Sequence, residues 1–324
     1  MECFVKFVAE KGATIAPLVI PHKDLSGPAL TNPSVLVLDD KIYVNLRNIN
    51  YTLYHSEIKK FEHVWGPLVY IHPENEVKLK TTNILCELNQ DLSIKNYSTI
   101  DTSLLDQTPI WEFVGLEDGR LMKWNNILYL CGVRRDTTTN GQGRMELSEI
   151  VFDGLKAKEV SRFRIPAPGE DTSYCEKNWM PILDIENHFV KWTNPTEIVK
   201  VDKENNTCET ILHKNYIPGM NDWRGSSQVI SWKDRYICLI HETNLFRSEC
   251  GRKDATYRHR FVVWDKDWNI IKYSKLFSFM NGEIEFCCGM DKLNNDFLIT
   301  FGYQDNAAYI LKVSEDIVEE FIYE

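Results

Sequence analysis

One unit recurs five times along the chain and constrains the fold more than any other feature of the sequence. Each unit consists of a polar cluster, an apolar strand, a short polar turn, a second apolar strand and another polar cluster. The turns are rich in Asp, Asn and Lys, which hairpin turns favour. The five units span residues 32–48, 117–136, 177–195, 224–242 and 285–306.

The polarity of these units favours an all-β fold, a five-bladed β-propeller. In an antiparallel hairpin, the start of the first strand and the end of the second lie at the same end, so both polar clusters of every unit fall opposite the tight turn. A radial arrangement would bring these clusters to one mouth of a central channel. A β-sandwich with charged strand ends is the alternative, but it gives no reason for five like units. We expect a single domain over residues 1–324, with residues 1–31 and 60–82 wrapping the outside or completing a blade.

The charge and composition of the chain argue against several classes of protein. The formal net charge is -10 and the basic residues are scattered, whereas a nucleic-acid-binding protein usually has a basic footprint. The N-terminal region is interrupted by Lys6, Glu10 and Lys11, so we expect neither a transmembrane segment nor a signal peptide. The nine cysteines form no CxxC pair, which predicts buried reduced thiols and a cytoplasmic location. Dispersed histidines and the lack of nucleotide-loop and HExxH patterns predict no metal site and no cofactor.

The most specific chemical feature is the segment GLEDGR at residues 115–120, which precedes an apolar strand. Transfer of a glycosyl group needs a carboxyl group that protonates a leaving oxygen or activates an acceptor hydroxyl, and burial or a like charge raises the pKa of such a group. Glu117 could act on Asp118 in this way, although neighbouring strand residues point to opposite faces. A charged β-turn with Gly119 at positive φ is the competing interpretation.

The segment GLEDGR resembles the GxEDPR signature of the inverting mannoside phosphorylases, which are five-bladed propellers related to β-mannoside hydrolases and β-1,2-mannosyltransferases. The likeness extends to residues 32–33, 43–47, 284–290 and 299–305. Two features depart from the family pattern. Gly119 replaces the proline, and the stretches EKNWMP, YRHRFVVWD and QDNAAYIL are more similar to bacterial and viral propeller proteins assigned as glycosyltransferases.

The resemblance implies roles for particular residues. It makes Asp118 the general acid, while Glu117 and Arg120 hold the sugar or orient Asp118. It also implies that Glu285 and Asp305 contact the substrate. Because phosphate is the nucleophile in that family, one protein carboxylate suffices and the usual pair of glycoside hydrolases is not required.

Transfer from a phosphorylated donor also needs a site for an anion, for which Arg and Lys are suited. The cationic candidates at the expected mouth are Arg134, Arg135, Lys177, Arg224, His241, Arg258 and Arg260. Alternation places Arg258 and Arg260 on one strand face, where they either act together or form a solvated face. The alternative role of Arg134 and Arg135 is a surface ion pair with Asp136. The alternative role of His241 is a structural hydrogen bond.

Sugar hydroxyls and the apolar face of a pyranose need polar and aromatic partners. Asn178 and Trp179 follow Lys177, Asn48 ends the first unit and Asn50 lies just after it. Packing between blades is the competing role of any single tryptophan.

The sequence therefore predicts an inverting enzyme that moves a mannose-like hexose between a phosphorylated donor and a carbohydrate acceptor. The number of cationic candidates favours synthesis from a nucleotide sugar over phosphorolysis. A mannoside phosphorylase or hydrolase acting in the degradative direction, and a carbohydrate-binding propeller without catalysis, are the alternatives. The oligomeric state does not follow from the sequence.

Overall fold

The computed structural model describes residues 2–54, 69–71, 78–170, 172–214, 216–219, 222–247 and 253–324. Most of the expected outer segment 60–82 therefore lies outside the described residues. Strands dominate the described chain, and the short helices are α1 (Phe4–Ala9), the 3-10 helix η1 (His22–Asp24) and α2 (Glu315–Tyr323). The all-β prediction is confirmed.

The first two groups of strands are antiparallel and join into one sheet. The first group contains β3 (Ala29–Leu38), β4 (Lys41–Ile49), β7 (Leu79–Leu88) and β8 (Ile94–Asp101). The second contains β10 (Glu117–Trp124), β11 (Ile127–Arg134), β12 (Arg144–Phe152) and β13 (Ala157–Arg164). They join where Ala157 and Lys158 of β13 pair in parallel with Ile100 and Asp101 of β8. The short strand β9 (Phe113–Val114) pairs with β7.

The remaining strands form further groups of the same kind. One sheet contains β14 (Met180–Pro181), β15 (His188–Trp192), β16 (Glu197–Asp202) and β17 (Thr207–His213). The next contains β18 (Arg224–Gly225), β19 (Ile230–Trp232), β20 (Arg235–Arg247), β21 (Lys253–Trp264), β22 (Ile270–Tyr273), β23 (Phe277–Ser278) and β1 (Glu2–Cys3). Another contains β24 (Glu285–Leu293), β25 (Asp296–Tyr303), β26 (Ala307–Ser314) and β2 (Thr14–Pro17). A separate pair is β5 (Thr52–Tyr54) and β6 (Val69–Ile71).

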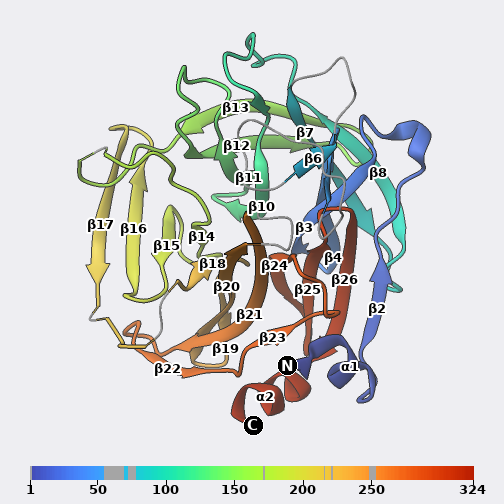
Figure 1. Ribbon diagram of the computed structural model, residues 1–324, viewed down its shortest axis with the longest axis vertical. Coiled ribbons are helices and arrows are strands. Elements are labelled where there is room, and N and C mark those ends of the chain that lie inside the picture. The colour runs from blue at the N-terminus through green and yellow to red at the C-terminus, as the bar shows by residue number, and fades with distance from the viewer. Residues whose placement is uncertain are drawn as a thin grey trace.

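The groups stand around a common centre, as in a β-propeller. Figure 1 shows β3, β10, β14, β18 and β24 nearest the centre, with the later strands of each group farther out. Each predicted hairpin is present, and turn residues such as Asp40, Asn126, Asn187, Lys233 and Asn294 have positive φ. The polar clusters that flank the hairpins therefore lie toward one end of the centre.

The two ends of the chain close the ring. The N-terminal strand β2 pairs antiparallel with β26, from Thr14 opposite Lys312 to Pro17 opposite Tyr309. Phe4 of α1 packs with its ring centroid 4.8 Å from that of Phe321 in α2. The expectation that the N-terminal segment completes a blade is confirmed for β2.

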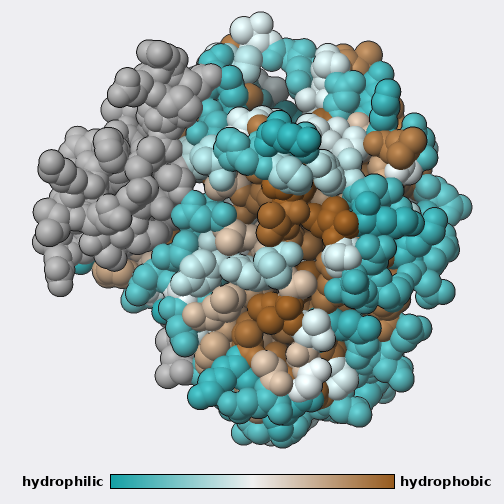
Figure 2. Space-filling view, turned by 90° about the vertical axis from the view of Figure 1, so that its right-hand side faces the viewer, coloured by the Kyte–Doolittle hydropathy of each residue, from teal (hydrophilic) through white to brown (hydrophobic). Residues whose placement is uncertain are grey.

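The surface of the ring is mixed in character. Figure 2 shows the side on which β2 and β8 lie, where hydrophobic residues gather toward the middle of the face between hydrophilic margins.

Among the described residues, no helix combines the length and the apolar character that crossing a bilayer requires. The cysteines in this part of the chain are free thiols, and most of them are buried.

Candidate active site

A β-bulge at the start of β10 turns two neighbouring carboxylates toward the same space. Glu117 pairs with Val133 and Arg120 with Cys131, so two residues of β10 lie opposite Gly132 of β11. Asp118, the first of these two, has a φ of 51°. The alternation that would send Glu117 and Asp118 to opposite faces is broken by the bulge. The opposite-face placement that strand alternation predicts is therefore wrong for this pair, since both side chains line one cavity.

Both carboxylates line a cavity of about 390 Å³ at the centre of the ring, which we call the central cavity. Several other predicted site residues also line it, and these are Arg135, Lys177, Asn178, Arg224, His241 and Asp305. The remaining lining residues were not predicted, and these are Asn32, Arg47, Tyr51, Trp111, Phe113, Tyr174, Tyr257, Ile284 and Phe286.

Arg47 of β4 holds the two carboxylates together. Its Nη1 lies 3.0 Å from Asp118 Oδ1, and its Nη2 lies 3.8 Å from Glu117 Oε2. The same Nη2 donates to the Tyr51 hydroxyl at 2.7 Å, and Asn32 Nδ2 donates to Asp118 Oδ1 at 2.8 Å. Arg47 is buried, so its charge acts on the carboxylates with little screening by solvent.

These contacts move the pKa values of the two carboxyl groups in opposite directions. Burial acts to raise the pKa of Asp118, but Arg47, the bond from Asn32 and the nearby Arg120 together hold it below its ordinary value. Burial raises the pKa of Glu117 above its ordinary value against the opposing effect of Arg47, and the charge of Asp118 adds to the rise. One carboxylate is thus kept ionised while its neighbour keeps its proton to higher pH, a division typical of acid–base sites.

Cationic groups occupy the side of the cavity formed by the later units. Arg135 donates to Gly141 O at 2.9 Å and to the Tyr174 hydroxyl at 3.2 Å. Arg224 lies 2.6 Å from Asp222 Oδ1. Lys177 lines the cavity but has neither a hydrogen bond nor an ion pair with any residue of the described ranges. An ammonium group without a partner beside an open cavity is suited to an incoming anion.

His241 and Tyr257 add neutral hydrogen-bonding groups. His241 Nδ1 lies 2.9 Å from Ser226 Oγ, and its ring stacks on Tyr257 with centroids 5.3 Å apart. Burial, together with nearby positive charge, holds the pKa of His241 well below its ordinary value. Burial raises the pKa of Tyr257 to about 12. Both side chains are therefore uncharged at neutral pH, and His241 does not add to the positive charge of the cavity.

Several residues predicted to bind sugar lie outside the lining of the central cavity, because their polar atoms are used within the fold. Trp179 is only 1% exposed, packs against Phe189 and donates to Glu176 at 3.1 Å. Glu285 is fully buried and accepts bonds from the backbone of residues 279–282.

The remaining residues predicted to bind sugar also form hydrogen bonds within the fold. Asn48 accepts from Ser26 N at 2.8 Å and donates to Ala29 O at 2.8 Å. Asn50 donates to Lys78 O at 3.0 Å. Arg120 donates to Ser226 O at 2.6 Å and to Asp118 O at 3.0 Å, so it holds the backbone of Asp118 in place.

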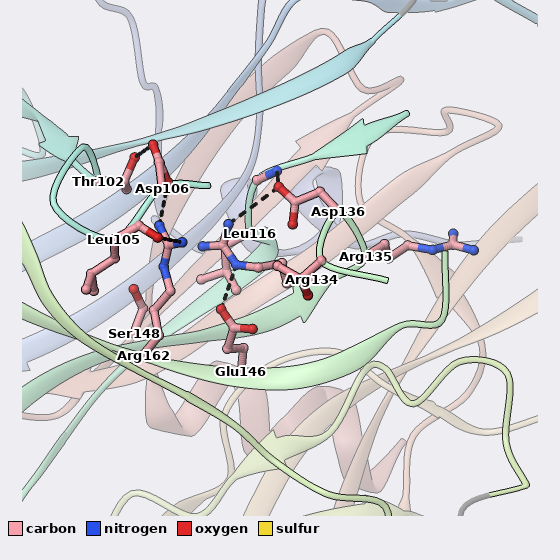
Figure 3. Close-up of polar contacts among 12 residues, drawn as sticks. Thr102, Leu105, Asp106, Leu116, Arg134, Arg135, Asp136, Glu146, Ser148 and Arg162 are labelled. Atoms are coloured by element: carbon pink, nitrogen blue, oxygen red, sulfur yellow. Dashed lines mark hydrogen bonds and ion pairs between the residues drawn. The ribbon is translucent and has the colours of Figure 1, made fainter. Parts of the chain in front are cut away.

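Three predicted phosphate ligands also lie elsewhere. Figure 3 shows Arg134 and Arg135 pointing in opposite directions, and Arg134 Nε bonds Glu146 Oε1 at 2.6 Å. Arg258 Nη1 donates to Gly282 O at 2.9 Å, and Arg260 Nε donates to Glu242 Oε1 at 2.5 Å. Alternation along β21 correctly predicts that these last two share a face, but that face meets backbone oxygens and a carboxylate rather than the central cavity.

Some of the missed lining residues carried a signal. Asn32 and Arg47 lie in segments that the family resemblance already included, and Tyr257 shares a strand face with His259 by alternation. Trp111 comes from the irregular segment before β9, and Phe113 comes from the two-residue strand β9, so no periodicity relates them to the mouth. In the described chain, no group of three His, Cys, Asp or Glu side chains is placed to hold a metal ion.

The chain matches no protein-family model, and its sequence matches no curated protein. Its fold, in contrast, is similar to that of solved carbohydrate-active proteins. The β-1,2-mannobiose phosphorylase from Listeria innocua, in complex with β-1,2-mannobiose, superposes with a TM-score of 0.55 at 14% identity over 96% of this chain and 97% of that one.

Two further structures are similar over nearly their whole length. MPT-4, a mannose phosphorylase from Leishmania mexicana in complex with a phosphate ion, has a TM-score of 0.52 at 11% identity, over 98% of this chain and 93% of that one. A structure from the GH130 family of mannoside phosphorylases, described as containing glycoside hydrolases that target β-1,2-mannosidic linkages in Candida mannan, has a TM-score of 0.60 at 10% identity, over 93% and 92%. At these identities the likeness establishes the fold of the chain.

Proposed function

We propose that this chain is a glycosyl-transferring enzyme that moves a mannose-like hexose, with inversion, between a phosphorylated donor and a carbohydrate acceptor. In this proposal the whole chain is one catalytic domain, a five-bladed β-propeller. The five hairpins, each starting a group of antiparallel strands around one centre, support the number of blades. The carbohydrate-active proteins with the same fold support the class of substrate.

One observation carries the proposal. One cavity brings together two carboxyl groups of opposite pKa shift, Glu117 and Asp118, and the ammonium group of Lys177, which has no polar partner within the described part of the chain. Hexosyl transfer to or from phosphate needs a group that exchanges a proton with the sugar oxygen and a cation that holds the phosphate.

Asp118 is our candidate for the group that exchanges the proton. Its pKa is held below the ordinary value, so it is ionised at neutral pH, which suits a base that takes the proton of an acceptor hydroxyl during synthesis. A phosphate bound at Lys177 and Arg135 adds negative charge to the same cavity, and a like charge raises the proton affinity of a carboxylate. The same residue then acts as the acid in phosphorolysis, as microscopic reversibility requires. Arg47 and Arg120 hold Asp118 in place and are positioning residues.

Phosphorolysis is the second candidate for the direction of the reaction. The preference for a nucleotide donor depended on a surplus of cations, and of the seven cationic candidates only Arg135, Lys177, Arg224 and His241 line the central cavity. Because His241 is held neutral by burial, this set matches the needs of one phosphate group. A sugar 1-phosphate or inorganic phosphate therefore fits the cavity at least as well as a nucleotide sugar.

The function can be tested with the purified protein in two reaction mixtures. The first contains β-1,2-mannobiose and inorganic phosphate, and the second contains GDP-mannose with mannose as acceptor. Mannose 1-phosphate that forms only in the first mixture identifies a phosphorylase, and acceptor-dependent release of GDP in the second identifies a nucleotide-sugar transferase. Mannose that still forms from β-1,2-mannobiose when phosphate is omitted from the first mixture identifies a hydrolase. Binding of the sugars without any product contradicts the proposal and favours a carbohydrate-binding protein.

A further inference from the structure

A second cavity, of about 430 Å³, lies beside the central cavity, and we call it the side cavity. It is enclosed by β7 and β8 of the first group, by β11–β13 of the second, and by the segment 102–116 that connects the groups. Within the described ranges, strand pairing between the two groups is confined to Ala157 and Lys158 of β13, at one end of β8.

The two cavities are separated by a thin wall of the same chain segments. Arg135 lines the central cavity, whereas its neighbours Arg134 and Asp136 line the side cavity. Phe113 and Glu117 face the centre, whereas Val114, Gly115 and Leu116 between them line the side cavity. Figure 3 shows Arg134 directed into the group of side-chain contacts and Arg135 leading away from it.

The polar groups of the side cavity are buried but incompletely satisfied. Asp136 is only 7% exposed, and its Oδ2 accepts from Gly115 N at 3.0 Å. Its Oδ1 is buried and has no hydrogen-bond partner among the described residues. Arg134 lies 3.7 Å from Asp136 Oδ2 and 3.8 Å from Glu159 Oε1, which is beyond hydrogen-bond distance. A buried acceptor without a partner is costly unless a bound group supplies the donor.

The charges around the side cavity disfavour both an anionic and a cationic ligand. Arg134 is bonded to Glu146, and Arg162 is bonded to Glu159 and Asp106. Unlike Lys177 in the central cavity, these cations already have carboxylate partners. A cationic ligand would lie close to two guanidinium groups. A neutral molecule that both donates and accepts hydrogen bonds satisfies Asp136 Oδ1 and the terminal nitrogens of Arg134 together.

We propose that the side cavity is a second binding site, for a neutral sugar unit. Hydroxyl groups of the sugar donate to Asp136 and accept from Arg134, and its apolar C–H groups contact Ile100, Leu116 and Ile150, which also line the cavity. The volume accommodates one hexose or a compact disaccharide. The choice of a mannose-containing probe rests on the proposed function, but the site itself rests on the geometry of the side cavity.

Isoleucine methyl groups allow the two cavities to be observed separately. Ile100 and Ile150 line the side cavity, and Ile284 lines the central cavity. In a protein carrying ¹³C-labelled isoleucine δ1 methyls, titration with mannose and with β-1,2-mannobiose is followed by methyl NMR. The expected result is a saturable shift of the Ile100 and Ile150 signals. Inorganic phosphate is expected to shift Ile284 alone.

A matched pair of variants assigns the signals to occupancy of the side cavity. Thr108 lines its exposed rim, whereas Ser103 lies on the same segment outside the lining. Thr108→Trp narrows the entrance and should weaken the response of Ile100 and Ile150 at least about tenfold, whereas Ser103→Trp should leave it unchanged. Asp136→Asn should also weaken binding about tenfold, because a charged acceptor is lost.

The possible outcomes separate this inference from the proposed function. Sugar that shifts Ile284 but neither Ile100 nor Ile150 overturns the second site and leaves the proposed function standing. Shifts of Ile100 and Ile150 in a protein without turnover support the second site and contradict the proposed function. A response of these two signals to spermidine but not to sugar, or no response to any probe, also overturns the inference.

Discussion

At the scale of single residues, the site depends on how Arg47 divides its contacts. One guanidinium group lies between Asp118 at 3.0 Å and Glu117 at 3.8 Å. The closer carboxylate, Asp118, is stabilised in its ionised form. The pKa of the more distant one, Glu117, is raised mainly by its burial. The contact with Arg47, together with Asn32 and Arg120 beside Asp118, therefore lowers the pKa of one carboxyl group, while burial raises the pKa of its neighbour in the same cavity.

Asp118→Asn tests the role of the ionised carboxylate. The amide keeps the size of the side chain but neither accepts nor delivers the proton, so we expect kcat to fall by about 10²–10⁴-fold with a small change in KM. Steady-state kinetics on the active reaction mixture measures both constants. Asp101→Asn, at the exposed end of β8, is the control and should behave as the wild type. Unchanged kcat in Asp118→Asn would remove this residue from the chemistry.

Lys177→Ala tests the anion site. Removing the ammonium group that faces the central cavity should raise KM for the phosphate-bearing substrate about 10–100-fold, because a hydrogen bond to a charged group contributes about 1.5–3 kcal/mol. Initial rates at varied phosphate or sugar phosphate give this constant. Lys200→Ala changes an exposed lysine of β16 and should leave KM unaltered. The anion site would have to lie elsewhere if the two variants gave the same KM.

The predicted residues that line the central cavity share one property: they flank the apolar strands of the repeated unit. Asp118, Lys177 and Arg224 reach the central cavity because each stands where a strand begins at the mouth. Trp179 stands at such a position too, but its indole faces the core, and the direction of one side chain does not follow from the position of its strand. Trp111 could not be predicted, because it comes from an irregular segment without periodicity.

At the scale of elements, the bulge in β10 is the feature on which the site depends. A side chain at Gly132 would place its Cβ 2.2 Å from Glu117 O, so the strand opposite the bulge needs a glycine. The hairpins themselves could be predicted, because turn residues and alternating apolar positions are local signals. The bulge could not, because it depends on the close approach of β11, which local sequence does not encode.

Gly132→Ala tests the dependence of the chemistry on the bulge. The new methyl group must displace the backbone of Glu117, so we expect kcat to fall about 100-fold, since small misplacements of reacting groups cost this much. In Gly119→Ala the new Cβ meets the side chain of Leu130 at 2.6 Å instead of backbone, and a side chain adapts more easily. Kinetics and thermal unfolding of both variants measure the difference. Activity of Gly132→Ala equal to that of the wild type would contradict the role of the bulge.

At the scale of the whole molecule, buried polar side chains near the centre join groups of strands that are distant in sequence. Gln228 donates through Nε2 to Val35 O and Leu121 O, each at 2.8 Å, and accepts from Met290 N at 2.9 Å. Its own segment lies between β18 and β19, so one side chain connects four groups. The repeat pattern predicts the groups, but it does not predict this connection, because each contact is non-local.

Gln228→Leu tests this connection. The variant leaves buried backbone groups on three strands without partners, at a cost of about 1–3 kcal/mol for each. We expect a fall in Tm of about 5–15 °C with a single unfolding transition, measured by calorimetry. Gln90→Leu changes an exposed glutamine that bonds Asp40 O and should alter Tm little. Separate transitions for different parts of the chain would contradict a closed, cooperative ring.

Asp291, which joins the last group of strands to the first, should strongly affect how the free energy of unfolding changes with pH. Asp291 accepts from Val37 N at 2.7 Å and from Lys292 N at 2.8 Å. Burial raises the pKa of its carboxyl group to about 7 against the effect of these bonds, and the charge of Asp184 adds to the rise. The carboxyl group therefore binds its proton more tightly in the folded chain than in the unfolded one, whose Asp has a pKa near 3.9.

The sign of the effect follows from proton linkage. As pH rises from about 4 to about 7, the unfolded chain releases this proton while the folded chain keeps it, so the free energy of unfolding falls by an amount on the order of 2–4 kcal/mol. Asp291→Asn carries no proton to release and should lose this part of the pH dependence, whatever its stability at one pH. Urea unfolding of both proteins at about pH 4.5 and pH 8 measures the difference. If the wild type and the variant lost stability equally between these pH values, Asp291 would be ionised in the folded protein, and the polar contact between β24 and β3 would be an ordinary charged one.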